Sequence, residues 1–378
     1  MKNKKQSLEL YVHIPFCVRK CHYCDFLSGP AKEEVQDAYM EALLKEVEGR
    51  SEEGAVVSIF IGGGTPSLVK VDWIVKLLAT IRRCYYVEPD AEISIEVNPG
   101  SVDEYKLIKY REAGINRLSI GLQSVSDKEL TELGRIHTYE QFLDTYECAR
   151  KVGFSNLNVD LMSALPGQTM DSWKNTLKTV VSLNPKPEHI SAYSLIIEEG
   201  TVLYRRQEEG TLQLPDEDED RRMYALTGTF LKEHGYHRYE ISNYAMDGYE
   251  CRHNCGYWKR TQYLGLGLGA ASLLKECRFR NGDDLQEYLT NPLGQREDFQ
   301  ELTEKEQMEE FMFLGLRMMT GVSIEAFVQA FGKKPEQVYG EVLEKNLENG
   351  LMEHSEGYYR LTDKGIDVSN YVLAQFLF

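Results

Sequence analysis

The stretch Tyr11-Val-His-Ile-Pro-Phe-Cys17-Val-Arg-Lys-Cys21-His-Tyr-Cys24-Asp-Phe26 places three cysteines directly after an apolar, strand-like run. Their spacing, three residues and then two, allows one loop to wrap round a single cubic iron–sulfur cluster. Three thiolates would bind three irons and leave the fourth open to a small ligand. A structural zinc site would need a fourth Cys or His, and His13 and His22 are near enough in sequence to supply one. The spacing alone therefore leaves both kinds of site open.

Composition narrows the class of protein. The 378 residues suffice for one large domain or for two to three smaller ones. A net charge of −17 argues against nucleic acid as a partner, because its binding relies on clustered Lys and Arg. No apolar run approaches the roughly 20 residues of a transmembrane helix. The basic start, Met1 to Gln6, lacks the apolar segment of a signal peptide, so we expect a cytoplasmic protein.

Of the eight cysteines, only the first three and the pair Cys251 and Cys255 are clustered. Clustered cysteines in a chain of this length indicate metal binding rather than a disulfide framework. We expect Cys84, Cys148 and Cys277 to be small, inert side chains.

The first two-thirds of the chain alternates strand and helix patterns. Strands are expected at 8–14, 56–61, 92–97, 117–121, 156–161 and 189–197. Helices are expected at 31–49, 69–83, 102–113, 126–151, 171–183 and 216–234, and a further strand at 236–242. Such repeated units predict an α/β fold with a parallel sheet, either open or closed into a partial barrel.

Polar or glycine-rich residues recur where the apolar strands end. The three cysteines follow the first strand, and the later strands are followed or ended by Gly62–Pro66, Glu96 and Asn98, Gln123, Asp160, and Tyr193 with Ser194. In barrels of this type the carboxyl ends of the strands form the active site. We therefore expect one convergent site.

The pattern of predicted helices and strands changes after residue 300. Helical patterns run through 303–319, 323–331 and 335–349, and 351–354 with 357–361 resembles a hairpin. These elements predict a C-terminal α+β, winged-helix-like module, and the acidic residues on its first helix argue against DNA binding. We divide the chain at 1–245, 246–300, which we expect to be a motif-bearing segment and connector, and 301–378.

The cysteine spacing, with an aromatic residue before the last cysteine, resembles the radical S-adenosylmethionine (SAM) superfamily. The wider string from Tyr11 to Cys17 resembles one branch of it, the oxygen-independent coproporphyrinogen III oxidases (HemN) and the related haem chaperones (HemW). This resemblance covers nearly the whole chain and favours the cluster over zinc. It implies a partial (β/α)6 barrel, a [4Fe-4S] cluster held by Cys17, Cys21 and Cys24, and SAM on the open iron.

The same resemblance implies the residues near SAM. Gly64 and Thr65 lie in the Gly62-Gly-Gly-Thr-Pro66 motif beside the SAM amino group, and Arg135 suits its carboxylate. The remaining contacts implied by the family are Tyr11 near the cluster, Glu96, Gln123, Asp160, and the backbone-type contacts Ser194 and Ala271.

Two departures separate the chain from the oxidases. Those enzymes carry a fourth cysteine two residues after the third, where this sequence has Phe26, and they carry a longer segment before the cluster. Both departures match the chaperone branch, which implies haem and apo-haemoprotein clients as partners, together with an electron donor. A coproporphyrinogen oxidase and a module with a vestigial cluster remain the alternatives.

The string His253-Asn-Cys-Gly-Tyr257-Trp258 resembles the haem-binding motif of the chaperone branch. An imidazole ligates haem iron, and aromatic rings offer apolar surface to a porphyrin. We therefore expect His253 to bind haem. The alternatives are a buried histidine packed by its neighbours, ligation by Cys251 or Cys255, and coordination of another metal.

Overall fold

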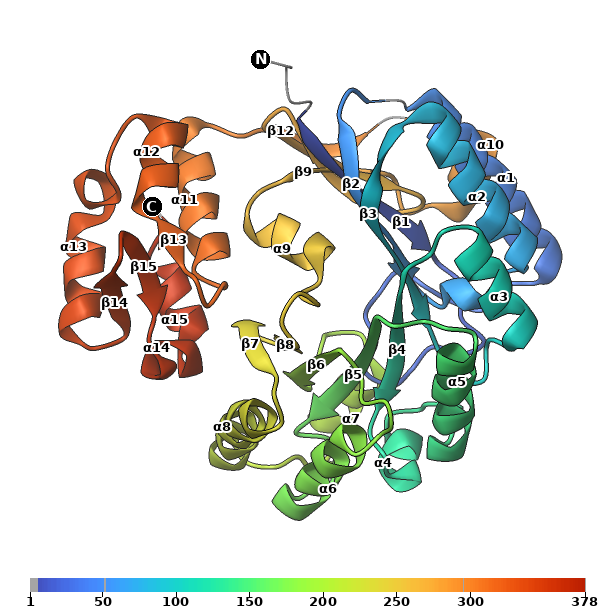
Figure 1. Ribbon diagram of the computed structural model, residues 1–378, viewed down its shortest axis with the longest axis horizontal. Helices are drawn as coiled ribbons and strands as arrows, with labels where there is room; N and C mark the ends of the chain where they lie inside the picture. The colour runs from blue at the N-terminus through green and yellow to red at the C-terminus, as the bar shows by residue number, and fades with distance from the viewer. Residues whose placement is uncertain (1–5, 51, 295, 378) are drawn as a thin grey trace.

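The structure, a computed structural model, describes residues 6–50, 52–294 and 296–377. It is built on one curved sheet whose outer face is covered by helices (Figure 1). The centre of the sheet consists of parallel strands in chain order: β1 (Ser7–Ile14), β2 (Ala55–Gly63), β3 (Tyr86–Val97), β4 (Arg117–Gln123), β5 (Leu157–Ser163) and β6 (His189–Ser194). All six strands of the sequence analysis are confirmed.

Amphipathic helices connect these strands across the outer face. On the second of them, Ile74, Leu77, Leu78 and Ile81 are buried at the three- and four-residue spacing of one helix face. The helices are α1 (Glu33–Gly49), η1 (Pro66–Leu68), α2 (Val71–Cys84), α3 (Glu104–Glu112), α4 (Asp127–Glu132), α5 (Tyr139–Lys151), α6 (Met170–Val181), α7 (Val202–Glu208) and α8 (Glu217–Glu233).

One expected helix is two. The pattern over 126–151 predicted a continuous helix, but α4 and α5 are separated by a loop in which Gly134 has φ +72°. The loop is held by other parts of the chain, since the amide of His22 donates to the carbonyl of Leu133 at 2.9 Å. Tertiary contacts thus override the local pattern and give Arg135 a loop position.

Further strands extend the sheet at both edges. After β6 come the antiparallel strands β8 (Asn243–Ala245) and β7 (His237–Glu240). Beside β1 lies the parallel strand β9 (Gln262–Leu266), followed outward by the antiparallel strands β10 (Ala271–Leu274), β11 (Cys277–Arg280) and β12 (Glu297–Glu301). The strands β7 and β12 end the sheet without pairing to each other, so the barrel is partial. The stretch expected as a connector therefore contains β11, α10 (Leu285–Thr290) and β12. The five residues of β12 are all exposed and show no apolar alternation, which explains why the pattern missed it.

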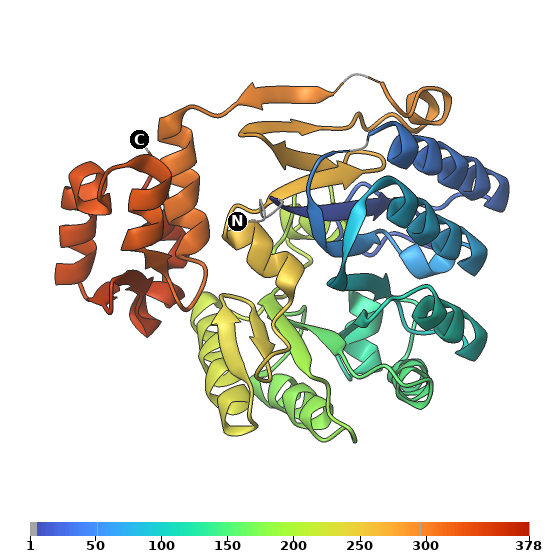
Figure 2. The same cartoon turned by 45° about the horizontal axis from the view of Figure 1, so that its top comes forward.

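The two faces of β1 differ in character. Every second side chain is buried and packs beneath the outer helices: Leu8, Leu10, Val12 and Ile14. The alternating residues Glu9, Tyr11 and His13 face the concave side of the sheet. A helix that the sequence did not predict, α9 (Arg252–Trp258), lies on this concave side and contacts β2 and β9 (Figures 1 and 2).

The C-terminal module has its own core, built round Met312, Leu316, Phe327 and Phe376. Its elements are α11 (Glu304–Gly315), β13 (Val322–Ser323), α12 (Ile324–Phe331), α13 (Pro335–Glu348), β14 (Met352–Ser355), β15 (Tyr358–Leu361), α14 (Asp363–Asp367) and α15 (Ser369–Ala374). The three predicted helices and the predicted hairpin are confirmed as α11, α12, α13 and β14–β15. No described helix is both long and apolar enough to cross a membrane.

A buried carboxylate fixes the β9–β10 turn to α1. Glu46 is 0% exposed and accepts hydrogen bonds from the amide of Gly267 at 2.7 Å, Asn281 at 2.7 Å and Tyr288 at 2.6 Å. It also pairs with Arg50 at 3.1 Å. One side chain thus joins three segments that are far apart in sequence.

Removing this carboxylate should destabilise the barrel. Because Glu46→Ala leaves Arg50 buried without its partner, we expect the free energy of unfolding in urea to fall by about 3 kcal/mol. Glu41→Ala, on an exposed position of the same helix, is the matched control and should change it by less than about 0.5 kcal/mol. Equal losses in the two variants would contradict the role of the network.

Candidate functional site

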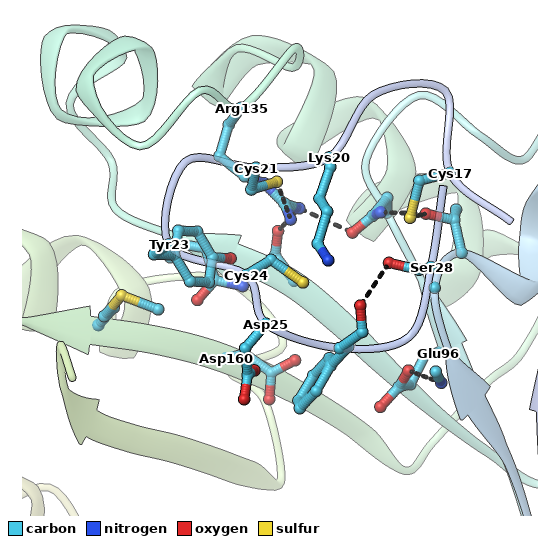
Figure 3. Close-up of a pocket in the computed structure, with 18 of the residues that line it drawn as sticks. Cys17, Lys20, Cys21, Tyr23, Cys24, Asp25, Ser28, Glu96, Arg135 and Asp160 are labelled. Atoms are coloured by element: carbon cyan, nitrogen blue, oxygen red, sulfur yellow. Dashed lines mark hydrogen bonds between the residues drawn. The ribbon is translucent and has the colours of Figure 1, made fainter. Parts of the chain in front are cut away.

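A cavity of about 380 Å³ opens at the carboxyl ends of the central strands (Figure 3). Ten of the thirteen site residues expected from the sequence line it: Cys17, Cys21, Cys24, Gly64, Thr65, Glu96, Gln123, Arg135, Asp160 and Ser194. They come from the cysteine loop, from β3 to β6, and from the loops after β2 and α4. Parallel strands bring their carboxyl ends to one edge, and this explains the convergence.

The cysteine loop is anchored on both sides. The amide of Cys17 donates to the carbonyl of Gly29 at 3.0 Å, and Arg19 donates to the carbonyl of Gly134 at 2.9 Å. His13 Nε2 lies 2.9 Å from the carbonyl of Leu27, so this nitrogen carries the proton. The loop is therefore held in shape by backbone contacts from several segments.

Two side chains direct N–H or O–H groups at the cysteine sulfurs. Thr65 Oγ1 donates to Cys17 Sγ at 3.5 Å, and Arg135 Nη1 donates to Cys21 Sγ at 3.8 Å. These donors can remain hydrogen-bonded to the sulfurs when the cysteines bind iron. Burial raises the pKa of Cys24, an effect that a bound metal would offset.

The arrangement suits a cluster better than zinc. Neither His13 nor His22 lines the cavity, and each imidazole already contacts a backbone carbonyl. Within the residues that the structure describes, no three Cys, His, Asp or Glu side chains converge closely enough for a single metal ion. Three thiols spread round a cavity, with no fourth cysteine among its described lining residues, match the donor set of a cubic cluster with one open iron.

Arg135 connects the site through hydrogen bonds. Its Nη2 donates to Asn98 Oδ1 and to the carbonyl of Gly121, both at 2.7 Å, and Asn98 Nδ2 donates to Thr65 Oγ1 at 2.7 Å. The sequence marked Asn98 as a strand end but did not predict this role. The guanidinium is thereby fixed beside the cysteines, where it can face a thiolate or a ligand carboxylate.

Two acids form the deep wall of the cavity. Glu96 accepts from the amide of Gly63 at 3.0 Å, and burial, with Asp160 nearby, raises the pKa of Glu96 to about 8. Burial also raises the pKa of Asp160, although Asn158 donates to it at 2.6 Å. Burial disfavours the ionised form of a carboxyl group that has no counter-charge. A cationic ligand would therefore stabilise both carboxylates.

Backbone geometry shapes the rest of the wall. A Cβ on Gly64 would lie 2.7 Å from the carbonyl oxygen of Phe16, so this position requires glycine. Gln123 has φ +70° and accepts from the hydroxyl of Tyr193 at 3.1 Å. Ser194 donates to Asp220 at 2.6 Å.

Two expected SAM contacts lie outside the lining. Tyr11 donates to His13 Nδ1 at 3.0 Å and stacks on Phe60, with ring centroids 6.4 Å apart. Ala271 is exposed on β10, opposite Arg280 of β11. The structure therefore places both side chains away from the cavity surface.

His253 also lies apart from the cavity, on α9. It is 2% exposed, its Nδ1 is 2.8 Å from Ser58 Oγ, and its Nε2 is 3.1 Å from Tyr257 Oη. The ring stacks on Phe60 with centroids 5.2 Å apart, and burial lowers the imidazole pKa to about 3. Both nitrogens are thus engaged, and ligation of an iron by this residue, which stays a prediction, would require the contacts with Ser58 or Tyr257 to break.

Contacts with the sheet fix the helix that carries His253, α9. Glu92 accepts from the amides of Arg252 at 3.0 Å and His253 at 3.3 Å, which caps the start of α9. A Cβ on Gly256 would lie 1.9 Å from Glu9 Oε1, so helix and strand are in close contact. Glu9 is buried, and this raises its pKa to about 9. At this end the concave face is closed by protein.

Several residues that line the cavity were not predicted as site residues from the sequence: Lys20, Tyr23, Asp25, Phe26 and Met162. Four of them stand inside the cysteine stretch itself. Their position between and after the cysteines was the available signal, but the spacing does not say which of them turn inward.

Comparison with known proteins identifies the families that this chain resembles. Residues 11–180 match the radical SAM superfamily and residues 302–368 match the HemN C-terminal domain. The solved structure of coproporphyrinogen III oxidase (HemN) from Escherichia coli, at 24% identity, has a TM-score of 0.86 and covers 99% of this chain and 90% of that one. At that identity the likeness establishes the fold alone.

Relatives at higher identity span the whole chain. The haem chaperone HemW of Lactococcus lactis is 37% identical over 97% of this chain and 96% of its own length. The Bacillus subtilis HemW is also 37% identical, over 97% and 98%, and the Escherichia coli HemW is 34% identical, over 99% of both. The chain therefore belongs to the HemW family of the radical SAM superfamily.

Proposed function

We propose that this protein is a haem chaperone, which binds a [4Fe-4S] cluster, SAM and haem and delivers haem to apo-haemoproteins. The observation that carries this proposal is the likeness to HemW proteins over nearly the entire length of both chains. The main alternative is a coproporphyrinogen III oxidase. Phe26, which stands where the oxidases carry a further cysteine, argues against it.

In this proposal Cys17, Cys21 and Cys24 hold the cluster. Arg135 and Thr65 stabilise its thiolates through the donors described above. When bound, the cluster supplies the electron that breaks a sulfonium C–S bond of SAM. The chain's own contribution is to orient the ligand and to exclude water.

The same cavity is proposed to hold SAM. Glu96, Asp160 and Gln123 offer oxygens to its cationic and hydroxyl groups, Gly64 allows close backbone approach, and Arg135 faces a carboxylate. Ser194 completes the wall that the family implies. Among the described residues, the amide of Gly63 alone donates a hydrogen bond to the buried carboxyl of Glu96, so this carboxyl retains capacity for a ligand.

Further expectations belong to this proposal. Apo-haemoprotein clients and an electron donor are the proposed protein partners, and nucleic acid is not among them. We propose a cytoplasmic location because the function requires reduced thiols. The division into 1–245, 246–300 and 301–378 is likewise proposed, and the separate core of the last part supports its final boundary.

Haem binding is the direct test of the function. Anaerobically reconstituted protein should bind haem saturably in an absorbance titration, because the proposed carrier must hold its cargo. The same sample, given SAM, a reductant and coproporphyrinogen III, should form no protoporphyrinogen IX. Absence of haem binding would end the chaperone proposal, and sustained turnover would establish the oxidase.

The cluster proposal predicts the iron content. Reconstituted protein should hold about four iron atoms per chain, and Ala at any of Cys17, Cys21 or Cys24 should abolish this, since each supplies one iron ligand. Cys84→Ala is the matched control and should retain full iron and the ultraviolet–visible spectrum. Retention of the cluster in Cys21→Ala would contradict the assignment.

SAM affinity should depend on pH through Glu96. Its pKa of about 8 leaves the carboxyl largely neutral at neutral pH, and only the carboxylate pairs with a cation. Affinity measured by anaerobic calorimetry should therefore rise with pH up to about pH 8, by at most about tenfold per pH unit. Glu96→Gln should remove this part of the dependence, whereas Glu34→Gln, exposed on α1, should leave it unchanged. Parallel pH profiles in wild type and Glu96→Gln would show that the carboxyl does not meet SAM.

A further inference from the structure

Exposed apolar side chains lie in the lining of the cluster cavity and on the cysteine loop that borders it. Phe26 is 62% exposed and Ile196 is 68% exposed, and both line the cavity. Val18 and Leu27, on the same cysteine loop, are also exposed. Single exposed apolar residues are ordinary, but a group of them round a cofactor cavity is typical of a binding surface.

Positive charge lies at the same mouth. Arg19 and Lys20 line the cavity and are exposed. Arg19 uses one nitrogen to bond the carbonyl of Gly134, and no ion pair involves Lys20 within the described part of the chain. The acids Asp25 and Glu198 also line the mouth and would repel a ligand's carboxylates from their own positions. The charges therefore select an orientation for an anionic ligand.

The interior of the cavity is not available to such a ligand. Its wall consists of the cysteines, buried acids and amides that suit the cluster and SAM. The surroundings of His253 are not available either, because the imidazole is buried and both its nitrogens are engaged. A flat apolar ligand with carboxylates at one edge matches the exposed apolar and cationic side chains at the mouth.

We propose that the mouth of the cluster cavity is the haem-docking surface, with one porphyrin face on Phe26 and Ile196 and the propionates on Arg19 and Lys20. This inference rests on the proposed haem chaperone function and names the site that serves it. Apolar burial supplies the affinity, and the two cations orient the ring. Axial ligation by His253 is not required for docking.

The test is haem titration of reconstituted, SAM-loaded protein, followed by absorbance without oxygen. The double variant Phe26→Ala/Ile196→Ser should bind haem at least about tenfold more weakly. Phe299→Ala is the matched control, because Phe299 is 61% exposed on β12 and does not line the cavity, and it should bind as wild type does. Iron content and SAM affinity are measured in the double variant as well, so that damage to the cluster and SAM site is distinguished from a loss of haem docking.

Two further probes test separately what the propionate carboxylates and the haem iron contribute to binding. Lys20→Ala should weaken binding of haem several-fold but leave binding of its dimethyl ester unchanged, because the ester lacks the carboxylates. Lys174→Ala, exposed on α6 and outside the lining, is the control. Iron-free protoporphyrin IX should compete with haem for the same surface, since docking does not depend on the iron.

The outcomes are distinct. If wild type binds no haem, the proposed function fails, and this inference fails with it. If wild type and the double variant bind haem equally while His253→Ala abolishes binding, the function stands and the docking surface proposed here is wrong. Weak binding by the double variant, with His253→Ala retaining most of the affinity, supports the mouth as the site.

Discussion

A carboxyl or imidazole group that is buried without hydrogen-bond partners costs several kcal/mol. The concave face of this sheet carries many buried carboxyl and imidazole groups, and each of them needs a partner. At the amino ends of the strands, α9 supplies the partners, since Glu92 caps the helix and Ser58 contacts His253. At the carboxyl ends, Glu96 and Asp160 border a cavity instead. One polar face is thus closed by protein at one end and left for ligands at the other, and this division determines where a cofactor can enter.

The central sheet was predictable because its signals are local. Apolar strands with turn residues at their ends, alternating with amphipathic helices, define a parallel sheet, and the carboxyl ends of such strands must meet. The elements that were missed depend on distant contacts. The strand β12 is exposed throughout and pairs only through β11, and the break after α4 exists because the cysteine loop binds Leu133. No pattern within those segments encodes such pairing.

The candidate site was likewise predictable where its signals are local and not where it depends on distant contacts. The cysteines and the strand-end residues converged as expected because one topological fact brings them together. The placement of His253 depends on Ser58, which is 195 residues away, and on Glu92, which is 161 residues away. A histidine inside a recognisable motif carries no sign of such partners. The sequence therefore indicated the chemistry of a motif better than its accessibility.

Accessibility matters because a chaperone has to release what it binds. A haem enclosed behind α9 would leave only when the contacts of Glu92, Ser58 and Tyr257 had broken, which couples release to local unfolding. A haem on the proposed docking surface buries one porphyrin face and leaves the other exposed. An acceptor protein can then engage the free face before the first contact is lost. When the haem leaves, the side chains of Phe26 and Ile196 return to solvent, while the contacts of Glu92 and Ser58 with α9 remain intact.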